Sequence, residues 1–139
     1  MMENQTIFLP VVFQILLTLW LYIYLAIAKS RAAKLGQVDE TRRALHDDAW
    51  PDNILQINNC IRNQFEVPVL FYVLILTLWS LNAINIAIHI LAWVFVLSRA
   101  IHAFIHTGSN QVPQRRKVFS FGCLILIVIA LFSLFKLLI

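Results

Sequence analysis

The chain is 139 residues long, 60% of its residues are hydrophobic, and only 13% are charged. Soluble domains carry about 25% charged residues, so this composition excludes a soluble fold and indicates an integral membrane protein. The formal net charge of +4 fits the basic loops of a membrane protein, and no nucleic-acid partner is expected. With only three glycines, the chain also lacks a Gly-rich phosphate loop.

Four apolar stretches are long enough to cross a bilayer, since a helical span needs roughly 20 mostly apolar residues. They cover about residues 6–28, 52–80, 83–106 and 114–138, and predict an all-α, four-helix membrane bundle in a single domain. At about 1.5 Å per residue the second helix would be about 43 Å long, against about 30 Å of hydrocarbon, so its polar first turns would project beyond the lipid. Pro68 leaves the Gln64 carbonyl without its helical partner, which predicts a bend there.

The basic residues are concentrated in two of the three connections between spans. The first connection holds Lys29, Arg31, Lys34, Arg42 and Arg43, and the third holds Arg115, Arg116 and Lys117. The second connection and the N-terminus hold none. Lys and Arg favour the cytoplasmic side of short loops, so the first and third connections are predicted to be cytoplasmic and both termini to lie outside.

Two polar stripes run along the second and third helices. Gln56, Asn59, Asn63 and Glu66 follow steps of 3, 4 and 3, and Arg99, His102 and His106 follow steps of 3 and 4. A carboxylate at membrane depth costs about 2.5–3.5 kcal/mol, so Glu66 is expected to face the bundle interior and to have a partner such as Arg99. Both stripes reach the same leaflet as Arg115 and Arg116. The sequence therefore predicts a polar pocket just inside the cytoplasmic surface.

Plainer interpretations of these residues remain open. Amides on membrane helices often join neighbouring helices, at about 0.6 kcal/mol each. Arg115, Arg116 and Lys117 fit ordinary interfacial anchors. His102 and His106 could ligate a metal together with Glu66, but the neighbouring arginines would repel a cation, and no metal is predicted.

The arrangement resembles the MAPEG superfamily, the membrane-associated proteins in eicosanoid and glutathione metabolism. The resemblance covers nearly the whole chain and includes "AKSRAAKL" after the first span, "RNQFEVPVLFYVL" in the second and "SRAIHAFIHTGSNQVPQRR" across the third and fourth. It implies a homotrimer with sites between subunits on the cytoplasmic side. It also implies glutathione as cosubstrate, with lipophilic substrates entering from the membrane lipid.

The resemblance assigns roles to individual residues. Asn63 and Glu66 match the motif residues that hold the polar ends of glutathione, and Arg99 matches a basic residue of the third helix. Arg115 or Arg116 would stabilise the thiolate. The remaining expected glutathione contacts are Arg31, Asn59, His102 and His106.

Three of these positions depart from the pattern of catalytic members. Asn59 stands where an arginine is usual, and His102 and His106 replace tyrosines. In these departures the chain is similar to the bacterial branch of the family.

The function expected from the stripes and the resemblance is a glutathione-dependent membrane transferase or peroxidase acting on lipophilic electrophiles. A free thiol with a pKa near 8.5 is mostly protonated at neutral pH, and a nearby arginine favours the reactive thiolate. Because position 59 holds Asn59 and not the usual arginine, a second interpretation stays open, a non-enzymatic protein that binds lipid or regulates a partner. A small transporter is a third interpretation, although no inverted repeat is visible.

Overall fold

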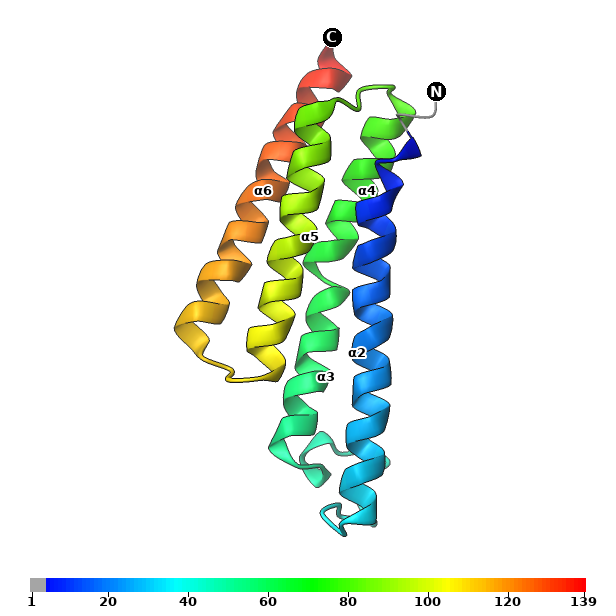
Figure 1. Ribbon diagram of the computed structural model, residues 1–139, viewed down its shortest axis with the longest axis vertical. Helices are drawn as coiled ribbons and strands as arrows, with labels where there is room; N and C mark the ends of the chain where they lie inside the picture. The colour runs from blue at the N-terminus through cyan, green and yellow to red at the C-terminus, as the bar shows by residue number, and fades with distance from the viewer. Residues whose placement is uncertain (1–4) are drawn as a thin grey trace.

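The computed structural model describes residues 5–139, and its regular secondary structure in that range is helical (Figure 1). The elements in chain order are α2 (Phe8–Lys34), the short 3-10 helix η1 (Asp47–Ala49), α3 (Asp52–Gln64), α4 (Val67–Ser80), α5 (Ile86–Thr107) and α6 (Val112–Leu138). Four segments are long and apolar enough to span a membrane: α2, α3 together with α4, α5, and α6. The predicted all-α, four-span architecture is confirmed.

The helix of the first span continues to Lys34, beyond residue 28, where the predicted span ends. Its last turns are rich in alanine and lysine, which favour helix, and Arg31 and Lys34 lie where cations stabilise the helix dipole. The helix then closes on Gly36, whose φ of 64° suits glycine. The amides of Gly36 and Gln37 donate to the carbonyls of Ala33 and Ala32, at 3.1 and 3.0 Å, as in a Schellman cap.

The helix of the second span is interrupted just before Pro68, where a bend was predicted. Helix α3 ends at Gln64, Phe65 and Glu66 are not helical, and Pro68 occupies the first turn of α4, where its missing N–H does no harm. Glu66 has φ −100° and ψ −94°, well outside the helical region. The break therefore falls just before the proline, and it changes the direction in which Glu66 points.

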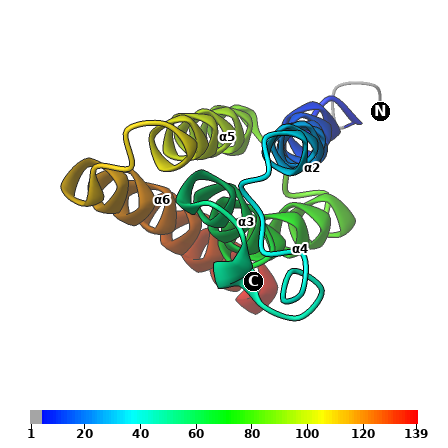
Figure 2. The same ribbon diagram turned by 90° about the horizontal axis from the view of Figure 1, so that it is seen from below.

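The connections alternate between the two ends of the bundle. Figure 1 shows the start of α2, the end of α6 and the α4–α5 turn at one end, which we call the terminal end. The α2–α3 and α5–α6 connections lie at the other, the loop end, where α2 and α3 extend past the α5–α6 turn. Seen from the loop end, the α2–α3 connection lies in front of α3 and α4 (Figure 2). Helix α5 packs against α6, α2 and α3, and α4 packs against α6.

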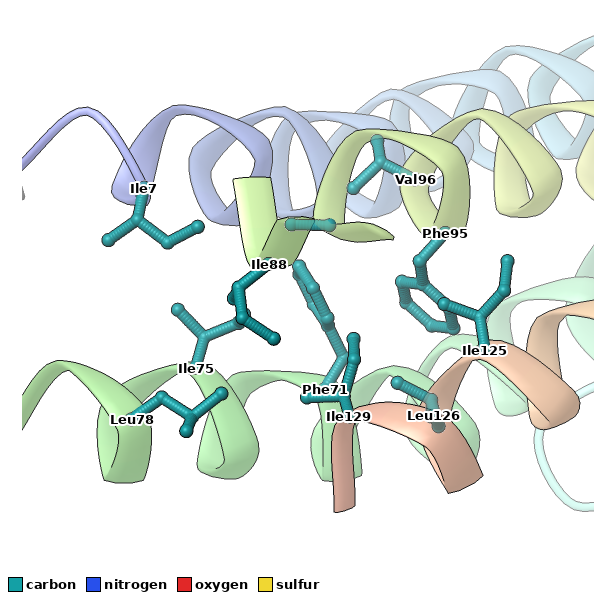
Figure 3. Packing of buried hydrophobic residues seen from close by; sticks show 11 residues of the cluster. Ile7, Phe71, Ile75, Leu78, Ile88, Phe95, Val96, Ile125, Leu126 and Ile129 are labelled. Atoms are coloured by element: carbon teal, nitrogen blue, oxygen red, sulfur yellow. The ribbon is translucent and has the colours of Figure 1, made fainter. Parts of the chain in front are cut away.

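The larger hydrophobic core fills the terminal half of the bundle (Figure 3). Phe71 of α4 stacks on Phe95 of α5 with ring centroids 4.6 Å apart, and Ile75, Ile125 and Ile129 surround them. A smaller cluster around Cys60 and Leu21 lies where α2, α3 and α5 meet. Apolar packing thus dominates the terminal half and leaves the polar side chains of the spans toward the loop end.

The α2–α3 connection is held in shape by ion pairs. Arg42 donates to the Asp48 carboxylate at 2.8 Å, and Arg43 pairs with Glu40 at 2.9 Å. Arg62 of α3 pairs with Asp47 and so ties the connection to the helix that follows it. The Lys29 ammonium lies 4.7 Å from the centre of the Trp50 ring. These contacts fix the entry to α3 at the loop end.

Candidate functional site

A polar cavity of about 250 Å³ lies between α3, α5 and α6 toward the loop end. Its lining residues are Asn63, His102, Val112, Arg115, Arg116 and Phe119. Each of the three polar segments singled out in the sequence contributes, because the antiparallel spans bring the end of α3, the end of α5 and the start of α6 to one level. The cavity therefore combines an amide, an imidazole and two guanidinium groups.

Arg99 precedes His102 by about one turn of α5, on the terminal-end side of the cavity, and is fully buried. Its Nη2 lies 3.1 Å from Nδ1 of His102, and its guanidinium carbon lies 5.3 Å from the centre of the Phe119 ring. Nε and Nη1 of Arg99 have no hydrogen-bond partner among residues 5–139. A buried cation with so few acceptors is costly. Because little solvent screens its charge, this guanidinium generates a positive potential close to the cavity.

His106 continues the same face of α5 and is also buried. Its Nδ1 lies 3.4 Å from the amide nitrogen of Asn63, and its ring centroid lies 5.4 Å from that of His102. The α5 stripe of Arg99, His102 and His106 thus faces inward as predicted. No group of three His, Cys, Asp or Glu residues in the described part of the chain is placed to hold a metal ion.

The stripe on α3 is oriented differently from the prediction. The inward face of α3 carries Ile57, Cys60, Ile61 and Gln64, so Asn59 lies on the surface, where Arg62 donates to its Oδ1 at 3.4 Å. Glu66 is exposed and makes no ion pair within residues 5–139. The expected inward orientation of Glu66 is wrong for the single chain, because α3 turns its apolar face and Gln64 inward and leaves the side of Asn59 and Glu66 exposed.

Arg31 also lies outside the cavity. It borders a groove of about 600 Å³ on the surface of α2, together with Ser30 and Lys34. Within one chain, therefore, the fold brings together Asn63, His102, Arg115 and Arg116, with His106 and Arg99 directly behind them. It does not bring Arg31, Asn59 or Glu66 to this cavity.

Three features of this region were missed in the sequence. Phe119 lines the cavity and covers Arg99, and Gly122, one turn further along α6, lies against Ser98 and Arg99. Gln64 is buried and accepts a hydrogen bond from Gln14 of α2 at 2.9 Å. A lone glutamine in the apolar first span and a lone glycine in the apolar fourth were the available signals.

An apolar groove of about 390 Å³ runs between α4 and α6. Aliphatic side chains of both helices line it, together with Cys123. Cys123 lies four residues after Phe119 on α6, about one helical turn from the polar cavity. The molecule thus offers a polar cavity and an apolar groove on successive turns of one helix.

Comparison with known proteins connects this geometry to a family. No curated protein and no solved structure matches the chain. The model of the MAPEG family matches residues 7–135, which include the first three spans, nearly all of α6 and every residue that lines the polar cavity. The chain therefore belongs to the MAPEG family.

Proposed function

We propose that the protein is a glutathione-dependent transferase, with peroxidase activity as a variant of the same chemistry, acting on lipophilic electrophiles. The observation that carries this proposal is the polar cavity, where two arginines from α6 meet Asn63 and His102. Glutathione is an anionic thiol, so a cavity dominated by guanidinium and other donor groups suits it electrostatically. Family membership supports the same ligand class.

Arg115 is the better placed of the two arginines to stabilise a thiolate. It is half-buried, and its Nη1 donates to Oδ1 of Asn110, which fixes the guanidinium at the wall of the cavity. Arg116 is exposed. A fixed, partly desolvated cation favours the thiolate more strongly than a mobile, hydrated one. The bound thiolate would then attack an electrophile held nearby, with proximity supplying much of the rate enhancement.

The electrophile is proposed to bind in the apolar groove between α4 and α6. The groove has no polar lining, which suits a lipophilic molecule. Because Cys123 in the groove and Phe119 in the cavity are one helical turn apart, a lipid-dissolved substrate there would lie close to the thiol.

We further propose that the site is completed by a second subunit in a homotrimer. Glu66 is exposed on the single chain, although a carboxylate facing lipid is costly. A neighbouring subunit packed on this surface would remove Glu66 and Asn59 from lipid, and would bring its own Arg31 to the ligand. Native mass spectrometry of the protein released from detergent would show a trimer if this arrangement holds.

Calorimetric titration of the purified protein with glutathione tests the proposal. We expect millimolar or tighter binding, and absence of heat at several millimolar would overturn it. Arg115→Ala should lower the turnover of glutathione with a lipophilic electrophile about a hundredfold, as for other groups that stabilise developing charge. Arg116→Ala should lower this turnover less. Lys136→Ala, which removes a cation at the terminal end of α6, is the matched control and should leave turnover unchanged.

The apolar groove favours a second candidate, a non-enzymatic lipid-binding protein with the same fold. It has an entirely apolar lining and a larger volume than the polar cavity. This candidate predicts that lipid copurifies with the protein, and that thiol conjugation is not detected with any lipophilic electrophile. Loss of turnover in Arg115→Ala with unchanged lipid content would exclude it.

A further inference from the structure

The contact between Arg99 and His102 determines where the imidazole carries its proton. A guanidinium has five N–H donors and no acceptor, so the 3.1 Å contact can only be a hydrogen bond from Nη2 of Arg99 to a lone pair on Nδ1 of His102. An imidazole whose Nδ1 accepts must carry its hydrogen on Nε2. The geometry therefore selects one of the two neutral tautomers and excludes the imidazolium, which has no free lone pair.

The same contact determines what His102 offers to the cavity. Its Nδ1 is occupied by Arg99, and Nε2 makes no hydrogen bond to any residue in the described range 5–139. Because His102 lines the polar cavity, Nε2–H is the polar group left for a ligand. His102 can thus donate a hydrogen bond, but it has no free lone pair with which to accept a proton.

Arg99 is held so that it cannot turn away from His102. The side chain is fully buried, and Phe119 of α6 lies over the guanidinium. Gly122 of α6 allows the two helices to approach, since a Cβ there would lie 3.8 Å from Cδ of Arg99 and 3.1 Å from Oγ of Ser98. His102 provides the sole side-chain acceptor for the guanidinium within residues 5–139, which strongly favours this pairing.

We propose that Arg99 is a positioning residue that keeps His102 neutral and protonated at Nε2, and that His102 donates this hydrogen bond to an anionic group of the bound thiol ligand. The acceptor is a carboxylate oxygen or the thiolate sulfur. His102 is therefore not the base that removes the thiol proton. This assignment rests on the proposed binding of glutathione, but the tautomer itself can be measured without any ligand.

The direct test is nitrogen NMR of the ¹⁵N-histidine-labelled protein in lipid nanodiscs near neutral pH. The chain has four histidines, and His102→Gln identifies the resonance of His102. We expect a protonated Nε2 and an unprotonated Nδ1. Protonation at Nδ1, or at both nitrogens, would overturn the proposal. Because this measurement uses the unmodified protein, it does not depend on whether any Arg99 variant folds.

Substitution of Arg99 then tests whether its hydrogen bond sets the tautomer of His102. Arg99→Met keeps the length of the side chain but removes the donor, and should give a mixture of the two tautomers. Arg99→Lys retains a donor and should restore the Nε2–H form at least partly. An unchanged His102 spectrum in folded Arg99→Met would show that Arg99 does not set the tautomer.

The role toward the ligand is tested at His102 itself. Gln places its amide nitrogen near the position of Nε2, whereas Asn places it near Nδ1, so His102→Gln should keep glutathione affinity within a few-fold and His102→Asn should lose roughly tenfold. His89→Gln, the same substitution at the other end of α5, is the control. Equal losses in both His102 variants would contradict donation from Nε2. Absence of glutathione binding in the unmodified protein, with the Nε2–H tautomer present, would instead overturn the proposed function.

Discussion

Gln64 is the buried polar residue of α3, and Gln14 of α2 meets it. Nε2 of Gln14 donates to Oε1 of Gln64 at 2.9 Å, and Nε2 of Gln64 donates to the Cys60 carbonyl at 3.3 Å. Both side chains are buried. In a membrane interior such a pair acts mainly as an interhelical link, because hydrocarbon offers an unpaired amide no alternative partner.

Removing one member of this pair should destabilise the protein more than removing both. Gln14→Leu leaves Oε1 of Gln64 without a donor, whereas Gln14→Leu combined with Gln64→Leu leaves two apolar groups in contact. We expect a coupling free energy of about 0.6–1.7 kcal/mol in a double-mutant cycle, measured by reversible unfolding in mixed micelles. Thr77→Val, which removes an exposed hydroxyl bonded within its own helix, is the control. Strictly additive effects would contradict the link.

At the scale of elements, the approach of α5 to α6 depends on Gly122. Oγ of Ser98 is held by its hydrogen bond to the Phe95 carbonyl at 2.6 Å, so it cannot easily move away from a Cβ placed 3.1 Å from it. Two effects of Gly122→Ala oppose each other. Alanine gains about 1 kcal/mol of helix propensity over glycine, but overpacking costs about 1–3 kcal/mol.

Because Oγ of Ser98 is held in place, we expect the cost of overpacking to exceed the gain in helix propensity. Gly122→Ala should then lower the free energy of unfolding by about 1 kcal/mol. Ser98→Ala in the same chain removes the obstructing oxygen, so the double variant should be at least as stable as the unmodified protein. Thermal unfolding in detergent measures both, with Ser98→Ala alone as control. A double variant no more stable than Gly122→Ala would show that the obstruction lies elsewhere.

The α2–α3 connection should lose its order only in acid. The hydrogen bond from Arg42 holds the pKa of Asp48 below its ordinary value of 3.8, and that from Thr41 does the same for Asp39. A lowered folded pKa means that the stabilisation is present above the ordinary carboxyl pKa and is lost as the pH falls through the lower, folded value. The connection should therefore be unchanged across neutral pH.

Trp50 should report the loss of order in acid, because its Nε1 donates to the Arg43 carbonyl and its ring contacts Lys29. Its fluorescence, isolated by difference from a Trp50→Phe variant, should be constant near neutrality and shift at strongly acidic pH. Asp48→Asn should shift the signal already at neutral pH and flatten the acid response. A transition near pH 6 would point to a group other than these carboxylates.

Hydropathy located the four spans, because length and apolar composition are properties of each segment alone. Periodicity also grouped Arg99 with His102 correctly, since both lie within one uninterrupted helix. It gave only the relative positions of residues on α3, and not which face turns inward, so Glu66 was placed on the wrong side. That choice depends on what α2 and α5 present to α3, which is a property of the assembled bundle.

At the scale of the whole molecule, an even number of spans puts the start of the first span and the end of the last at the same end, and Figure 1 shows them there together with the α4–α5 turn. Apart from Lys136, the basic residues lie toward the opposite, loop end, where the polar cavity opens. The distribution of charge favours a cytoplasmic loop end. Glutathione is abundant in the cytosol, so this orientation would also give the proposed cosubstrate direct access to Arg115.

Single-cysteine labelling in intact cells tests this orientation. Gln37, at the loop end, and Ser80, at the terminal end, are both exposed on the chain. Of the native cysteines, Cys60 is buried and Cys123 lies in the apolar groove, so neither should react with a polar, membrane-impermeant maleimide. We expect Ser80→Cys to be labelled in intact cells, and Gln37→Cys only after the cells are permeabilised. The opposite pattern would place the polar cavity on the outer face and remove cytosolic glutathione as its ligand, because the cavity and Gln37 share one end of the bundle.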